Sequence, residues 1–88
     1  MPWTYPADLM TALQTHGVAP RPDSEPRRVR DFINDLYRYE IRRLRDWRAT
    51  GVVRKEDYVD RVIALRKQYW VLTLTPSAWE RICGGERP

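Results

Sequence analysis

The sequence predicts a small all-α domain: one bundle of about four helices (short, long, medium, short) built on a central antiparallel helical hairpin. Apolar residues recur every three or four positions along most of the 88 residues, which is the helical period. Proline, glycine and capping residues separate these stretches. Only Val71–Leu74 alternates as a strand does, and it is too short for an independent sheet. Residues 1–88 are therefore expected to form a single helical domain.

The first predicted helix covers residues 6–16. Pro6 suits a first helical turn, where its missing N–H is not needed, and Gly17 suits the left-handed conformation that ends many helices. So short a helix is unstable alone in water, so it must pack against the rest of the domain. Residues 1–5 ahead of it are expected to be loose.

The longest predicted helix follows a proline-containing linker and begins after a Ser24 cap, with Pro26 in its first turn. It ends near Thr50, because Gly51 is a typical helix stop. Its length would be roughly 40 Å, which is longer than a small globule needs. Its apolar stripe consists of Val29, Phe32, Ile33, Leu36, Tyr37, Ile41, Leu44 and Trp47. Ion pairs along this helix are expected at Asp35–Arg38, Glu40–Arg43 and Arg42–Asp46.

A third helix is expected from about Lys55 to Tyr69. The connection that precedes it is so short that the third helix must run antiparallel to the long one. Val71–Leu74 is predicted to be an extended connector whose leucines fill the core. Thr75 then supplies the cap of a last short helix, Pro76–Cys83. Residues 84–88 after it are expected to be loose.

The composition argues against several classes of site. One His and one Cys cannot supply the four ligands of a structural zinc site, so neither a metal nor another cofactor is expected. Ser24 and Ser77 are accounted for by helix caps and first turns, and the chain has neither a Gly-x-Ser-x-Gly turn nor a phosphate-binding loop. We therefore expect no enzymatic activity. Because apolar runs are short, we expect no membrane-spanning segment and a cytoplasmic location.

The most distinctive feature is the arginine content of the long helix. Residues 24–51 carry eight of the fourteen arginines, interleaved with aromatic residues, in a chain of net charge +4. Tyr, Trp and Arg are the usual anchors of protein interfaces. We therefore predict a non-catalytic interaction module: a small accessory subunit that docks on a larger protein or self-associates into a homo-oligomer. The predicted protein-binding residues are Tyr37, Tyr39, Arg42, Arg43, Trp47, Tyr69 and Trp70, with Trp3 and Tyr5 as a further hook.

Three other interpretations of the same helix stay open. The arginine face could bind nucleic acid through Arg27, Arg28, Arg38, Arg42, Arg45 and Arg48. Alternatively, the rings are plain core and the arginines a solvated surface. A third interpretation places Asn34, Asp35 and residues 37–40 in a buried polar cluster that sets a partner's register. Salt separates nucleic-acid binding from an aromatic interface, because only phosphate contacts weaken steeply as salt rises.

Overall fold

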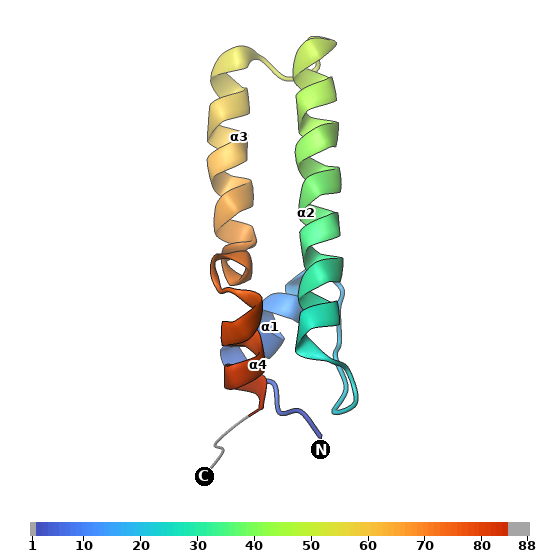
Figure 1. Cartoon of the computed structure of the whole chain (residues 1–88). Helices are drawn as coiled ribbons and strands as arrows, with labels where there is room; N and C mark the ends of the chain where they lie inside the picture. Colours follow the sequence, from blue (N-terminus) through green and yellow to red (C-terminus); the bar gives the residue numbers. More distant parts are fainter. Residues whose placement is uncertain (1, 85–88) are drawn as a thin grey trace.

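The protein, represented here by a computed structural model that describes residues 2–84, is all-α. Figure 1 shows the two longest helices side by side as an antiparallel hairpin, with the short helices gathered at one end of it. The elements in chain order are α1 (Ala7–Thr15), α2 (Pro26–Ala49), α3 (Lys55–Gln68), the 3₁₀ helix η1 (Trp70–Thr73) and α4 (Pro76–Cys83). The Cα envelope measures 53 × 19 × 17 Å, so the molecule is a rod. The predicted fold class and order of helix lengths are confirmed.

Helix boundaries follow local signals, with one exception. Thr75 caps α4, since its side chain accepts a hydrogen bond of 3.1 Å from the backbone N–H of Ala78. Gly51 follows α2 with φ +82°, a left-handed conformation that costs a side-chain-bearing residue energy. The prediction of a Ser24 cap for α2 is wrong, because the cap residue is Glu25. Ser24 instead accepts from the backbone N–H of Arg21 at 3.0 Å, which stabilises a turn in the linker.

Residues 71–74 are not the extended connector that their alternation predicted. Trp70–Thr73 forms η1, in which the N–H of Leu72 donates to the Tyr69 carbonyl at 3.0 Å. This tighter winding buries Val71 completely, while Leu72 and Leu74 are only half-buried. The carbonyl of Val71 accepts a 2.9 Å hydrogen bond from the indole N–H of Trp79, so its burial leaves no unpaired acceptor. Val71 is thus the fully buried residue at this point, and Leu72 and Leu74 pack against the core from its edge.

The N-terminal residues are also ordered differently from the prediction. The backbone N–H of Trp3 donates to the Pro22 carbonyl at 2.8 Å, and that of Thr4 donates to the Cys83 carbonyl at 2.7 Å. Tyr5 is 9% exposed. Residues 3–5 are therefore anchored on their own chain, because burying the Tyr5 ring outweighs the entropy cost of ordering the segment. The predicted loose C-terminal tail falls mainly on residues 85–88, which lie outside the described residues.

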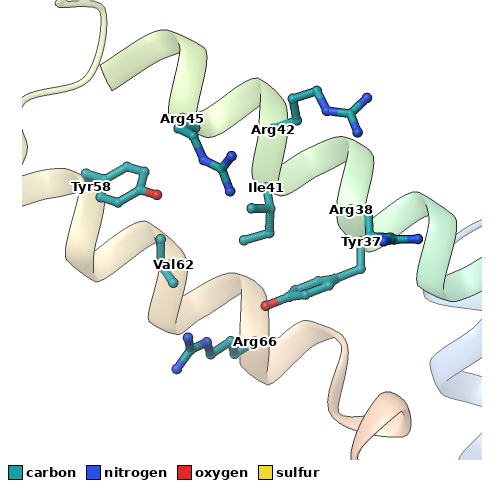
Figure 2. Close-up of a pocket in the computed structure, with 8 residues that line it drawn as sticks. All are labelled: Tyr37, Arg38, Ile41, Arg42, Arg45, Tyr58, Val62 and Arg66. Carbon is teal, nitrogen blue, oxygen red and sulfur yellow. The ribbon is translucent and has the colours of Figure 1, made fainter. Parts of the chain in front are cut away.

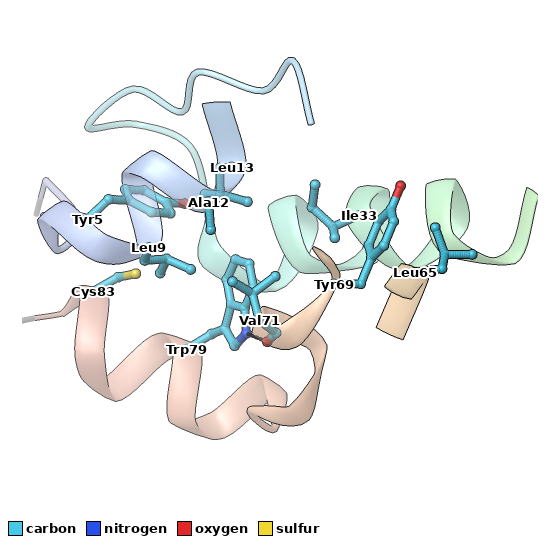
Figure 3. Packing of buried hydrophobic residues seen from close by; sticks show 10 residues of the cluster. All are labelled: Tyr5, Leu9, Ala12, Leu13, Ile33, Leu65, Tyr69, Val71, Trp79 and Cys83. Carbon is cyan, nitrogen blue, oxygen red and sulfur yellow. Dashed lines mark hydrogen bonds between the residues drawn. The ribbon is translucent and has the colours of Figure 1, made fainter. Parts of the chain in front are cut away.

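The main hydrophobic core lies at the end of the hairpin where α1 and α4 pack, which we call the base (Figure 3). Trp79 from α4, Leu13 from α1 and Ile33 from α2 are each fully buried there. The core consists of Tyr5, Leu9, Ala12, Leu13, Ile33, Leu65, Tyr69, Val71, Trp79 and Cys83. Elements that are far apart in the sequence meet in this core, so the base is what holds the chain together.

The other end of the hairpin, residues 41–62, is called the arm. Within it only Leu44 and Val53, among the described residues, are buried hydrophobic side chains. Figure 1 shows α1 and α4 at the opposite end of the rod, so the arm consists of two helices without a third layer. Two packed helices leave most of their side surfaces open, and these surfaces are the most prominent candidates for a binding site.

Candidate functional site

A groove runs along one side of the hairpin between α2 and α3 (Figure 2). It has a volume of about 380 Å³. We call it the arginine groove, and its lining consists of Tyr37, Arg38, Ile41, Arg42 and Arg45 of α2 with Tyr58, Val62 and Arg66 of α3. In Figure 2, Arg45 and Tyr37 extend from α2 towards α3, whereas Arg42 lies at the outer rim. The groove therefore has an apolar floor and a basic rim.

The arginines of the groove form no ion pair within residues 2–84. No carboxylate lines the groove, and none of its four arginines forms an ion pair or a side-chain hydrogen bond with the described residues. The predicted pairs Asp35–Arg38, Glu40–Arg43 and Arg42–Asp46 do not form. Exposed pairs of this kind contribute little free energy, and Glu40 has a competing partner in the Tyr69 hydroxyl. Four arginines thus line one groove without a direct ion pair to a described residue.

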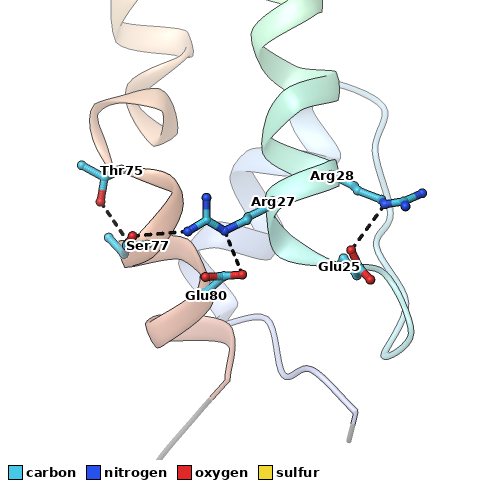
Figure 4. Close-up of polar contacts among 7 residues, drawn as sticks. Glu25, Arg27, Arg28, Thr75, Ser77 and Glu80 are labelled. Atoms are coloured by element: carbon cyan, nitrogen blue, oxygen red, sulfur yellow. Dashed lines mark hydrogen bonds and ion pairs between the residues drawn. The ribbon is translucent and has the colours of Figure 1, made fainter.

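The remaining arginines predicted for nucleic-acid binding lie elsewhere or are occupied. At the base, Arg27 pairs with Glu80 at 2.9 Å and Arg28 pairs with Glu25 at 3.3 Å (Figure 4). Arg48 lies over the ring of Tyr58, with its guanidinium carbon 5.3 Å from the ring centroid. Of the six predicted residues, the groove therefore gathers Arg38, Arg42 and Arg45.

The opposite side of the hairpin carries what we call the aromatic flank. Its residues recur at spacings of three and four along α2, which places them on one helical face: Phe32, Leu36, Tyr39, Arg43 and Trp47. Phe32 and Tyr39 are 52% and 58% exposed. The Arg43 guanidinium carbon lies 4.7 Å from the Trp47 ring centroid and 5.8 Å from that of Tyr39, so this arginine joins two aromatic rings by cation–π contacts.

The residues predicted to bind protein are divided by the structure. Tyr39, Arg43 and Trp47 lie together on the aromatic flank, while Tyr37 and Arg42 line the arginine groove. Trp70, at the start of η1, is 39% exposed. Tyr69 is only 3% exposed and belongs to the core of the base, so its ring is not presented at the surface. The predicted hook residues Trp3 and Tyr5 pack on their own chain.

Tyr69 is the centre of a small polar contact between α1, α2 and α3. Its hydroxyl donates to the carboxylate of Glu40, and its ring stacks on His16 with centroids 4.0 Å apart. The Nε2 of His16 lies 2.9 Å from the Gln68 carbonyl oxygen. Burial, followed by the hydrogen bond and the charge of Glu40, raises the pKa of Tyr69. The phenol therefore stays protonated and serves as a structural donor.

Four further observations concern buried polar residues, the Cys83 thiol, metal ligands and membrane-spanning helices. No polar or charged residue among positions 2–84 is buried, so the hypothesis of a buried polar cluster around Asn34 and Asp35 is wrong. Cys83 is fully buried, and burial raises the pKa of its thiol to about 11, which leaves it protonated at neutral pH. In the described part of the chain, no three His, Cys, Asp or Glu side chains gather in a way that could hold a metal ion. No helix there is long and apolar enough to cross a membrane.

Sequence reasoning missed the contribution of α3 to the arginine groove. Tyr58, Val62 and Arg66 recur every four residues and share one face of α3. Their spacing was visible, but which side of α2 they would meet depends on how the hairpin closes. Comparison of the chain with known protein families, with curated proteins and with solved structures found no match.

Proposed function

We propose that this protein is a non-catalytic interaction module that docks on a larger protein through the α2–α3 hairpin, with the aromatic flank as its apolar anchor. The observation that supports this most is the set of cation–π contacts of Arg43 with Tyr39 and Trp47, on the helical face that also carries the half-exposed Phe32 ring. Exposed aromatic surface is unfavourable in water, so its burial under a partner makes the free energy of binding more favourable. Tyr, Trp and Arg in contact with one another are typical of the centres of protein interfaces.

In this proposal the base stabilises the fold, and the hairpin presents the binding surface. The base buries the residues that hold the fold together, such as Trp79 and Ile33, while the hairpin leaves Phe32 and Tyr39 exposed. A surface that is held in place by a separate core can be presented to a partner without reorganisation. The occupant is either a larger protein or a second copy of this chain, and the mass in solution distinguishes the two.

The second candidate function is nucleic-acid binding, and the arginine groove is the observation that favours it. Arg38, Arg42 and Arg45 lie unpaired along one side of α2, where phosphate groups could neutralise them. Such binding would weaken by orders of magnitude between low and moderate salt, whereas docking through the aromatic flank would change far less.

The proposed function is tested by removing the two exposed rings of the aromatic flank. We expect the Phe32→Gln/Tyr39→Gln variant to fold normally, because both side chains are half exposed and Gln is a good helix former. Affinity capture from nuclease-treated extract of cells that express the protein is expected to retain a stoichiometric protein partner with the natural chain and to lose it with the variant. Light scattering at low and high salt then reports whether self-association replaces the partner.

The matched control is Val59→Gln/Ile63→Gln, which removes two comparably exposed apolar side chains, at 55% and 48%, from α3. Capture should persist in this control. Equal loss in both variants would assign the contact to general surface hydrophobicity and contradict docking through the aromatic flank. Retention by the natural chain of a partner that disappears after nuclease treatment would favour the nucleic-acid function instead.

A further inference from the structure

The lining of the arginine groove contains four arginines that form no ion pair with a described residue. Arg38, Arg42 and Arg45 occupy positions i, i+4 and i+7 of α2, and Arg66 lines the same groove from α3, with its guanidinium at the outer edge (Figure 2). Like charges at such spacing destabilise a helix slightly. Some of the other arginines do pair with carboxylates, as at Arg27–Glu80. An anionic ligand in the groove would supply the ion-pair partners that these arginines lack among the described residues.

The apolar floor of the groove indicates which kinds of anionic ligand would fit it. Between the arginines the lining is apolar, formed by Ile41 and Val62. A small inorganic anion would pair with the rim but leave this floor uncovered. A ligand that carries both carboxylates and aliphatic side chains would satisfy the rim and the floor together.

The tyrosine rings of the groove speak against a nucleic acid as the occupant. Single-stranded nucleic acids bind by stacking bases on free aromatic faces. One face of Tyr58 is already covered by the Arg48 guanidinium at 5.3 Å. The ring of Tyr37 packs against Tyr69, with centroids 5.2 Å apart. Part of each ring is therefore already in contact inside the protein, which leaves fewer free aromatic faces for base stacking.

The spacing of the arginines is compatible with a partner α-helix. Along α2 the three arginines rise by roughly 6 Å and then about 4.5 Å. A helix lying along the groove presents carboxylates at positions i, i+4 and i+7 with the same rises. The arm has two helices and few buried side chains, so a third helix would complete a bundle that the base already has.

We propose that the arginine groove binds an acidic amphipathic α-helix of the partner protein, whose carboxylates pair with Arg38, Arg42, Arg45 and Arg66 while its aliphatic residues cover Ile41 and Val62. This inference rests on the proposed docking function and names the chemistry of the partner segment. A second copy of this chain is a poor occupant, because its net charge of +4 would add to the charge of the groove.

The test uses three probes and the full-length protein. The first probe is a synthetic amphipathic helical peptide of Leu, Ala and Glu, with Glu at i, i+4 and i+7. The second is the same peptide with Gln for Glu, and the third is single-stranded oligo-dT. We expect the Glu peptide to bind at least about tenfold more tightly than the Gln peptide, and to shift the amide resonances of residues 38–45 and 58–66.

The groove variant is Arg42→Gln/Arg45→Gln, and its matched control is Arg61→Gln/Lys67→Gln. Both remove two positive charges that form no ion pair with the described residues, but Arg61 and Lys67 are not part of the groove lining. We expect the groove variant to lose about tenfold or more in affinity for the Glu peptide, and the control to stay within about twofold. Equal losses of affinity in the two variants would show that the peptide responds only to the net charge of the protein, and would overturn the inference.

Two other outcomes also overturn it. Equal affinity for the Glu and Gln peptides would show that carboxylates are not what the groove recognises. Tighter binding of oligo-dT than of the Glu peptide, at the same ionic strength, would assign the groove to nucleic acid. Neither result tests the aromatic flank. If partner capture still depends on Phe32 and Tyr39, the proposed docking function is retained and only the proposal of an acidic partner helix is wrong.

Discussion

At the scale of single residues, two arginines of α2 have different roles. Arg30 donates from its guanidinium to the carbonyl oxygens of Leu74 at 2.9 Å and Leu72 at 3.1 Å. These bonds fasten η1 and the connector after it to α2. Arg38, two turns further along, has no ion pair or side-chain hydrogen bond within the described chain. One arginine is structural, and the other is available to a ligand.

This contrast predicts different costs for one substitution. Arg30→Gln removes two charge-assisted hydrogen bonds and should lower the free energy of unfolding by about 2 kcal/mol. Arg38→Gln should change it by less than about 0.5 kcal/mol, because the residue is exposed and unpaired. Urea denaturation followed by circular dichroism measures both. If Arg38→Gln were as destabilising as Arg30→Gln, the groove arginines would have to be part of the fold rather than a free surface.

At the scale of the elements, α2 belongs to two environments at once. Its N-terminal half is packed in the base around Ile33, and its C-terminal half forms the arm, where Leu44 is the buried side chain that it contributes. Helical stability in proteins comes mostly from such packing, so the arm is held less firmly than the base. A binding surface on the less stable element can be ordered further by its partner.

Hydrogen exchange tests this division. Backbone amides in residues 41–62 should exchange faster than those around Ile33 and Trp79, because fewer buried side chains oppose local opening of the arm. Leu44→Ala should speed exchange in the arm and leave the base protected, whereas Ile33→Ala should lower protection throughout. Equal protection of arm and base in the natural chain would contradict the division. Addition of the Glu peptide should slow exchange in the arm.

At the scale of the whole molecule, the base keeps three titratable groups away from water. Burial raises the pKa of the Cys83 thiol from its ordinary 9.0 to about 11. Burial, and then the neighbouring Cys83, raise the pKa of Tyr5, and burial with Glu40 raises that of Tyr69. Each group stays protonated in the folded chain at a pH where the unfolded chain would release its proton.

The sign of the resulting pH dependence follows from this difference. The stability that these protonated groups contribute is fully present below pH 9.0, where folded and unfolded chains hold the same protons. Above it the unfolded chain loses the Cys83 proton first and the tyrosine protons beyond pH 10.0, so the free energy of unfolding should fall as pH rises. Urea denaturation across this range measures the decline.

Cys83→Ala is the variant that isolates the first part of the decline. It should flatten the slope between pH 9.0 and 10.0, whatever its effect on stability at neutral pH, because the thiol that titrates there is gone. The decline above pH 10.0 should remain, because burial still raises the pKa of Tyr5 and Tyr69, although Tyr5 loses the smaller contribution from Cys83. An unchanged slope in the lower interval would show that Cys83 is not the group responsible.

The sequence by itself determined where the four α-helices are and how the long pair folds back, but not the 3₁₀ helix η1. Thr75, Gly17 and Gly51 act on their immediate neighbours, and the three- and four-residue period of apolar positions is a local property. Such signals act over a few residues, so they can be read without knowledge of the rest of the chain. The arginine and aromatic character of α2 was also visible, although its division into two sides was not.

The tertiary structure alone decided how those side chains are used. Val71 winds into η1 because Trp79 and Arg30 supply partners for that segment, and Tyr5 is buried because α1, the linker and α4 meet around it. Arg38, Arg42 and Arg45 become part of one groove only when closure of the hairpin adds Tyr58, Val62 and Arg66 of α3 to its lining. These outcomes depend on contacts between residues far apart in sequence, whose free energies no local pattern contains.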